Sequence, residues 1–210
     1  MTQSKACKKN DMKLLGITGG IGSGKSLVLS ILSEEPGAYI VEADRLAHTL
    51  MKPGHTCYRR IVDCFGEEIL GPDGTIDRER LGRKVFQDEE ALACLNRIVH
   101  PSVKRCIRAR IRRARERGVR LFVIEAALLI QDGYRSICDA LWYIHVDREL
   151  RIHRLLESRG GTREKWEAVL SSQPEDHFFS SNTDVTIEND GAVEELREKT
   201  SKELQRLFLM

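Results

Sequence analysis

Residues 19–26, with the sequence GGIGSGKS, constrain the fold of this chain more than any other feature. They match the pattern GxxxxGK[ST] without a mismatch, after a short apolar run (residues 13–18) and before residues with helical spacing (26–33). In this context glycines let successive backbone N–H groups turn toward phosphate oxygens, and the helix N-terminus faces the same anion. A glycine-rich turn that only joins strand to helix is the alternative, and the complete motif disfavours it.

The motif predicts a nucleoside triphosphate as one substrate. Lys25 is expected to reach the β- and γ-phosphates, and the Ser26 hydroxyl is expected to hold Mg²⁺. The residues of this segment that we expect to bind the nucleoside triphosphate are Gly20, Ile21, Gly22, Ser23, Gly24, Lys25, Ser26 and Leu27. The motif does not identify the group that accepts the phosphoryl.

Apolar runs and helical spacing predict an α/β fold. The expected strands are residues 13–18, 39–41, 121–125, 140–146 and 185–187. Strands that alternate with helices indicate a parallel sheet of about five strands with helices on both faces. We expect one domain with a core (13–53 and 119–210), a helical insert (54–118), a lid (148–175) and a flexible N-terminal extension (1–12).

An acidic segment follows the second expected strand. In an open parallel sheet, ligands bind beyond the carboxyl ends of the strands, so Asp44 would face the phosphates. A carboxylate there can accept the proton of an attacking hydroxyl. Asp is also a preferred N-cap, so Asp44 could instead begin the next helix, and position alone leaves both interpretations open.

Arginines cluster after the fourth expected strand. Within sixteen residues the chain carries Arg148, Arg151, Arg154, Arg159 and Arg163. With Gly160 and Gly161 as a hinge, this segment is typical of a lid that closes cations over phosphates. The alternative is a solvated helix face whose arginines pair with neighbouring glutamates.

Composition excludes several classes of protein. The 34 Lys and Arg residues nearly balance the 32 Asp and Glu residues, so the net charge of +2 does not indicate a nucleic-acid or membrane partner. No apolar run approaches the ~18–20 residues of a membrane-spanning helix, and a cytoplasmic protein is expected.

Residues 104–120 hold nine basic side chains, but Val103, Ile107, Ile111 and Ala114 share one helix face, which favours an amphipathic helix with a solvated basic side.

Two smaller features are interpreted structurally. His100 and Pro101 are expected to mark a helix boundary, since proline suits a first helical turn. None of the six cysteines is spaced as CxxC, and no Cys/His group has zinc-finger spacing, so free thiols are expected.

Taken in order, several segments resemble the dephospho-CoA kinase family over nearly the whole chain from Lys13 onward. The segments are GITGGIGSGKS, EADRLAH, GTIDRERLGRKVF, HPSV, VIEAALLIQDGY, the arginine segment and TIENDG. The resemblance implies phosphoryl transfer from ATP, with Mg²⁺, to the ribose 3′-hydroxyl of dephospho-CoA, the last step of CoA biosynthesis. It also implies a P-loop kinase core with a helical substrate-binding region and a lid.

The resemblance assigns roles to particular residues. Asp44 would contact the acceptor ribose as the base, and Arg45 and His100 would bind the acceptor. The lid arginines would be Arg151, Arg154 and Arg159, with Arg154 also binding ATP, and Asn189 would lie near the ATP adenine. The chain departs from the family where Glu42 and Glu125 stand in place of a common Asp, and where GKSL replaces the usual GKST.

Two other functions remain open at this point. One is another small-molecule P-loop kinase, acting on a nucleoside or nucleoside monophosphate. The other is a nucleotide-dependent, nucleic-acid-associated ATPase that uses residues 104–120, which predicts steeply salt-dependent binding to DNA or RNA. The expected partners are ATP and dephospho-CoA, without nucleic acid or membrane, and we expect a monomer or a weak homo-oligomer.

Overall fold

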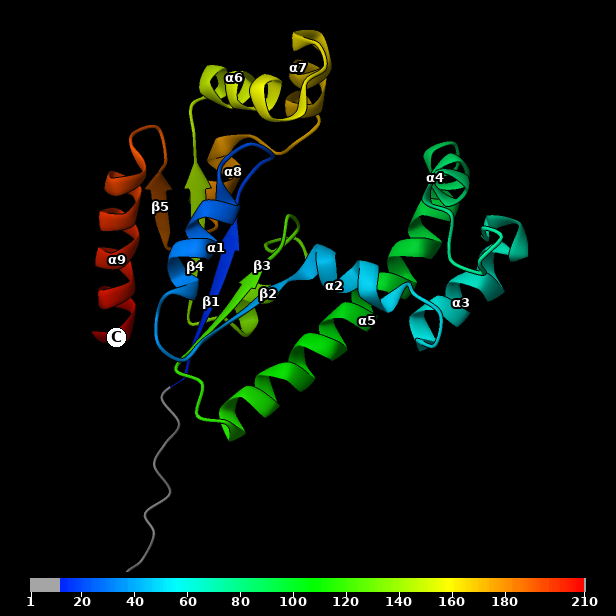
Figure 1. Cartoon of the computed structure of the whole chain (residues 1–210), viewed down its shortest axis with the longest axis horizontal. Coiled ribbons are helices and arrows are strands. Elements are labelled where there is room, and N and C mark those ends of the chain that lie inside the picture. Colours follow the sequence, from blue (N-terminus) through cyan, green and yellow to red (C-terminus); the bar gives the residue numbers. More distant parts are fainter. Residues whose placement is uncertain (1–11, 210) are drawn as a thin grey trace, which may run out of the picture. The chain divides into compact units, whose positions relative to one another are not determined.

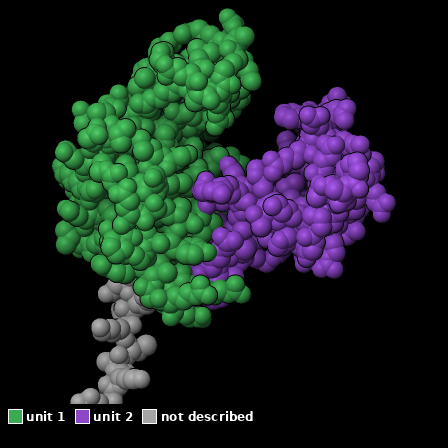
Figure 2. Space-filling view, in the orientation of Figure 1, with its two compact units in different colours: residues 1–41, 113–210 green, residues 42–112 purple. Residues whose placement is uncertain are grey.

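The computed structural model describes residues 12–209. The expected N-terminal extension therefore falls almost entirely on residues 1–11, which lie outside the described residues, while Met12 is buried. The chain forms two compact units, one of residues 1–41 and 113–210 and the other of residues 42–112 (Figure 2). Each unit is described by itself.

The first unit is built on a five-stranded parallel sheet in the order β2-β3-β1-β4-β5 (Figure 1). The strands are β1 (Lys13–Thr18), β2 (Ala38–Glu42), β3 (Leu121–Glu125), β4 (Ala140–His145) and β5 (Val185–Glu188). All five expected strands are confirmed, with ends that differ by one residue at most. The apolar runs reflect burial: β1 and β3 are covered on both faces, so nearly every residue in them is buried.

Helices cover this sheet and extend beyond it. They are α1 (Lys25–Ser33), α6 (Arg148–Arg159), α7 (Arg163–Ser171), α8 (Asp176–Ser181) and α9 (Val193–Leu209). Helices α1 and α9 contribute Val28, Leu32 and Leu196 to the core against β1 and β4. Because β1 lies between β3 and β4, the carboxyl ends of these three strands meet where the chain enters the phosphate-binding motif.

The second unit is helical. Its elements are α2 (Ala43–Leu50), α3 (Thr56–Phe65), the short 3₁₀ helix η1 (Glu67–Ile69), α4 (Arg78–Phe86) and most of α5 (Glu89–Glu116). The unit has its own core, in which Ile61, Phe65 and Ile69 pack with Leu81 and Ile98. The helical insert expected from the sequence therefore has the packing of a separate compact unit.

The structure corrects the expected helix boundary at His100 and Pro101. Helix α5 runs without a break for 28 residues, with Pro101 inside it. An internal proline costs about 3 kcal/mol, but buried Ile98, Val103 and Ile107 keep helical spacing on both sides of it. Burial of this continuous apolar face outweighs the local preference. The four residues expected on that face are all buried, as predicted.

The expectation of free thiols is wrong for two cysteines. Cys64 of α3 and Cys94 of α5 form a disulfide. The two helices pack in one core, so residues thirty positions apart become neighbours. The expectation holds for Cys57, Cys106 and Cys138 among the described residues, and burial raises the pKa of the Cys138 thiol to about 12. None of the described helices is long and apolar enough to cross a membrane.

Candidate active site

The phosphate-binding motif forms a loop between β1 and α1. Gly22 and Gly24 adopt left-handed backbone angles, with φ of 79° and 84°, which side-chain-bearing residues rarely adopt. A Cβ atom on Gly24 would also collide with the amide nitrogen of Asn189. The glycine at this position is therefore required both by its conformation and by the close approach of a residue 165 positions later.

Lys25 lies at the first turn of α1 with its ammonium turned into the loop. Its Nζ donates to the carbonyl oxygens of Gly19 at 2.9 Å and Gly20 at 3.2 Å. The same nitrogen is 3.8 Å from Oε1 of Glu125, the last residue of β3. Both side chains are largely buried, with exposures of 17% and 10%. A cation is thus held beside the loop, with a buried carboxylate next to it.

A pocket of about 550 Å³ opens on the loop. Its lining comes from the loop, the start of α1 and the end of α6: Ile21, Gly22, Gly24, Lys25, Ser26, Arg154, Leu155, Glu157, Ser158 and Arg159. Three of these side chains are cationic and two, Ser26 and Ser158, carry hydroxyls, which suits a polyphosphate with a divalent cation. Leu27 differs from the other expected ATP-binding residues, because its side chain packs against the sheet core.

Asn189 and Arg154 connect this loop to β5 and α6. The Asn189 side chain is buried and donates to the carbonyl oxygen of Ser23 at 2.9 Å. Arg154 of α6 donates to the carbonyl oxygen of Asn189, also at 2.9 Å. Two residues that the resemblance placed near ATP thus lie in one hydrogen-bonded chain with the loop.

Arg151 and Gln173 hold the tip of the loop, and Gln173 was not identified from the sequence. The Arg151 side chain donates from Nε to the Ile21 carbonyl at 3.2 Å and from Nη2 to the Gln173 side chain at 2.9 Å. Gln173 Oε1 also accepts from the backbone N–H of Ile21 at 3.1 Å. Only 8% of Arg151 is exposed and burial lowers its pKa, so the solvated-surface interpretation is wrong for this arginine. No motif marks Gln173, which follows α7 in a connecting segment.

The segment expected to be a lid has a small core of its own. Ile152 and Leu155 of α6 pack with Trp166 and Leu170 of α7, and Ile21 from the loop tip packs against them. Between the helices Gly160 and Gly161 have φ of 64° and 88°, and the Trp166 indole donates to the Gly160 carbonyl at 2.8 Å. The loop tip therefore contacts this segment through both polar and apolar groups.

Asp44 lies in the second unit, in the first turn of α2. The N-cap of α2 is Glu42, not Asp44, so the interpretation of Asp44 as the cap is wrong. The Asp44 carboxylate is exposed, and no hydrogen bond or ion pair engages it within residues 12–209. Arg45 pairs with Glu42 at 2.7 Å, which gives the unusual Glu42 a partner.

A pocket of about 410 Å³ lies in the second unit. It is lined by His48, Met51, Lys52, Pro53, Thr75, Ile76 and Arg78. No sequence pattern singles out His48, Lys52 or Arg78 as site residues, although His48 and Arg78 belong to segments that carry the family resemblance. His100, expected to bind the acceptor, is half-buried within α5 and does not line this pocket.

Comparisons with known proteins agree on one family. The family model described as dephospho-CoA kinase matches residues 13–195. The dephospho-CoA kinase of Carboxydothermus hydrogenoformans is 37% identical over 195 residues, which is 93% of this chain and 94% of the relative. That of Geobacter sulfurreducens is 40% identical over 188 residues, covering 90% and 95%. The crystal structure of TT1252 from Thermus thermophilus superposes with a TM-score of 0.78 at 28% identity, covering 93% and 97% of the two chains.

Proposed function

The chain belongs to the dephospho-CoA kinase family, and we propose that it transfers the γ-phosphoryl group of ATP to the ribose 3′-hydroxyl of dephospho-CoA. The products are CoA and ADP. The single observation that carries the proposal is the complete phosphate loop, with Lys25 turned into it, in a chain whose match to this family spans residues 13–195.

ATP binds on the first unit in this proposal. The backbone N–H groups of the loop and the start of α1 receive the phosphates, and Lys25 leaves its carbonyl partners to contact the β- and γ-oxygens. Arg154 and Arg159 add positive charge from the lid helix α6. Asn189 holds the loop in place through the Ser23 carbonyl. Fixed cations of this kind stabilise the charge that develops during phosphoryl transfer.

Mg²⁺ is the cofactor that we propose, with the Ser26 hydroxyl as its protein ligand. Hydroxyl and carboxylate oxygens are the donors that Mg²⁺ prefers, and the ion usually keeps several waters. Ser26 lines the pocket, and buried Glu125 lies beside Lys25, which lines it too, so we assign this carboxylate to hold such a water. The ion supplies neutralisation of the phosphate charge. The Glu125 side chain is longer than that of the Asp common in the family, and this length suits contact with the ion through a water molecule.

Asp44 is the proposed base. Its carboxylate caps no helix and has no partner among residues 12–209, so it is available to hydrogen-bond an acceptor hydroxyl. A positioned base both aligns the attacking oxygen and removes its proton. Because Asp44 follows the carboxyl end of β2, its place in the chain is typical of ligand-binding residues in parallel sheets.

The second unit is the proposed acceptor-binding region. Its pocket combines the cationic or titratable side chains of His48, Lys52 and Arg78 with apolar Met51 and Ile76. Dephospho-CoA carries diphosphate anions and a long pantetheine arm, and a pocket of mixed character suits both. We also propose His100 and Arg45 as further acceptor contacts, on the strength of the family resemblance.

The proposal is tested with the whole chain, ATP and Mg²⁺ against a panel of acceptors. We expect stoichiometric ADP release and a product with the mass of CoA when dephospho-CoA is present, and background ADP with nucleosides and nucleoside monophosphates. ADP release with a nucleoside acceptor and none with dephospho-CoA would replace this proposal with the neighbouring kinase function.

We further propose that the chain acts in the cytoplasm, as a monomer or weak homo-oligomer, without a nucleic-acid partner. The residues expected on the apolar face of residues 104–120 are buried, which supports a structural role for this helix and a solvated role for its arginines. A filter-binding titration with DNA and RNA at low and high salt tests the last point, and steeply salt-dependent retention would contradict it.

A further inference from the structure

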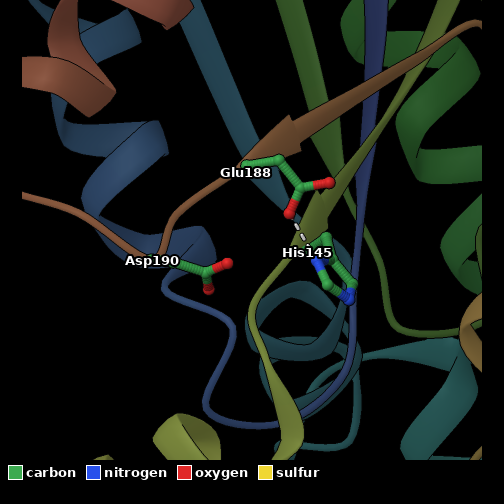
Figure 3. A group of neighbouring side chains, drawn as sticks. All are labelled: His145, Glu188 and Asp190. Atoms are coloured by element: carbon green, nitrogen blue, oxygen red, sulfur yellow. Dashed lines mark hydrogen bonds and ion pairs between the residues drawn. The ribbon is translucent and has the colours of Figure 1, made fainter.

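Three potential metal ligands meet at the carboxyl ends of β4 and β5 (Figure 3). His145 is the last residue of β4 and pairs in register with Glu188, the last residue of β5, and Asp190 follows two positions later. One ligand atom from each lies within 4.8 Å of the others. We propose that His145, Glu188 and Asp190 bind a divalent transition-metal ion, with Zn²⁺ as the ion that fits, at a site separate from the ATP-associated Mg²⁺.

The orientation of the His145 ring supports a metal ligand. Its Nδ1 lies 2.5 Å from Glu188 Oε2, while its Nε2 faces a different carboxylate, Asp176 Oδ2, at 3.4 Å. Metal-binding histidines usually donate their second N–H to a carboxylate, which fixes the tautomer and the ring orientation. Asp176 is suited to that task, because it accepts the Tyr143 hydroxyl at 2.5 Å and lies 3.8 Å from Arg151. Asp176, the carboxylate that would orient His145, is thus itself held in place.

Asp190 is also positioned by the backbone. Its Oδ1 accepts the N–H of Asp147 at 3.0 Å, and Asp147 in turn caps the start of α6. The second carboxylate oxygen of Asp190 remains to serve as the ligand. A tetrahedral zinc ion would draw its ligand atoms to ~3.3 Å apart, a movement that the exposed side chains of Glu188 and Asp190 allow.

The charge of the group favours a cation. Two carboxylates, those of Glu188 and Asp176, lie within 3.4 Å of the ring nitrogens of His145, and Asp190 is the third acid of the group. A bound dication would neutralise two of these carboxylates. An imidazole among carboxylates selects zinc-like ions over Mg²⁺ or Ca²⁺.

A bound ion would join elements that surround the phosphate loop. It would tie β4 to β5 and to the turn that carries Asn189, whose side chain holds the Ser23 carbonyl. The site is therefore structural in this proposal: it fixes the turn between β5 and α9 and takes no part in phosphoryl transfer.

The test uses the full chain, treated with chelator and dialysed, and titrated with Zn²⁺ alone in nucleotide-free buffer. We expect calorimetry to report one tight Zn²⁺ site per chain and a higher melting temperature with the ion. His145→Gln and Asp190→Asn should abolish that site, and Asp176→Asn should weaken it by roughly 10–100-fold by releasing the ring. All of these variants keep every cysteine, so zinc bound by thiols would survive in them.

His153→Gln is the matched control, since His153 and Glu157 form an exposed pair at 3.4 Å with only two ligands. It should bind Zn²⁺ as the parent does. If His145→Gln fails to fold by circular dichroism, the exposed Asp190→Asn variant decides the question. Unchanged Zn²⁺ affinity in folded Asp190→Asn, or no saturable site in the parent chain, overturns the proposal.

Discussion

The two units of this chain form their proposed sites in different ways. In the first unit much of the site is loop backbone, which buried Arg151 and Asn189 and half-buried Gln173 hold in place. In the second unit the proposed groups are side chains on helix surfaces, with exposed Asp44 in the first turn of α2 and Lys52 and Arg78 around a pocket. The shape of a site built from backbone depends on the side chains that pack behind it. The affinity of a site built from surface side chains depends on each of those side chains separately.

This difference predicts two kinds of mutational response. Substitutions behind the phosphate loop should change ATP binding and stability together, because the same contacts shape the loop. Substitutions on the second unit should change acceptor kinetics while the melting temperature stays constant. Single substitutions in the two units separate these responses.

Lys25→Ala should lower turnover by about 10²–10³-fold, the usual effect of removing one group that stabilises developing charge. The chain should remain folded, since the Lys25 side chain does not belong to the apolar core. Steady-state kinetics with ATP and dephospho-CoA measure the loss. Lys202→Ala, an exposed position on α9, is the control and should retain parental turnover. Near-normal turnover in folded Lys25→Ala would show that the loop is not the phosphate site.

Gln173→Ala should raise the KM for ATP by roughly 5–10-fold, because one hydrogen bond to the loop tip contributes about 1 kcal/mol. Gln173→Glu keeps an oxygen that accepts the Ile21 N–H and attracts Arg151, so it should restore most of the affinity. Gln87→Ala at the end of α4 is the exposed control. An unchanged KM in Gln173→Ala would mean that the loop tip needs no support from this residue.

Arg78→Ala should raise the KM for dephospho-CoA by about 10-fold or more, the scale of one charge-assisted hydrogen bond, with little change in kcat. The melting temperature and the KM for ATP should match the parent. Arg83→Ala, exposed on the same helix, provides the comparison. A raised KM for ATP, with the acceptor unaffected, would remove the pocket from the acceptor site.

Asp184→Asn should have the smallest effect, a loss of about 0.2–1 kcal/mol of unfolding free energy at neutral pH. Arg135 and the backbone N–H of Leu141 both contact this carboxylate, and the Arg135 hydrogen bond lowers its pKa. A lowered folded-state pKa contributes stability above the unfolded value of about 3.9, and that stability is lost as pH falls through the folded-state pKa. Urea titrations should therefore show parent and variant converging in acid, and a constant difference at every pH would contradict the ion-pair account.

The parts of the fold that local sequence determines were predictable. The strands and the phosphate loop are visible as apolar runs and glycines, because burial on both faces and left-handed backbone angles restrict the residue types allowed. Gly160 and Gly161, expected as the hinge of the proposed lid, both have positive φ. These features depend on neighbours within a few residues.

The features that were not predicted depend on contacts distant in sequence. Gln173 meets Ile21 across 152 positions, and nothing in the residues around it indicates that contact. Pro101 was expected to mark a helix boundary because its local preference is strong, yet the continuous apolar face of α5 outweighs it. Cys64 and Cys94 pair because two helices pack together, which no spacing rule detects. Local patterns specify elements, and tertiary packing specifies their partners.

The most direct test of the account is the turnover of Asp44→Asn with dephospho-CoA, measured beside its affinity for ATP. The carboxylate is exposed and caps no helix, so the change removes a charge with little effect on folding. We expect turnover to fall by about 10²-fold or more, the usual contribution of a positioned base. ATP affinity and melting temperature should stay at parental values, as they should in the exposed control Asp63→Asn. Asp44→Asn turnover within a few-fold of the parent would contradict the assignment of Asp44 as the base.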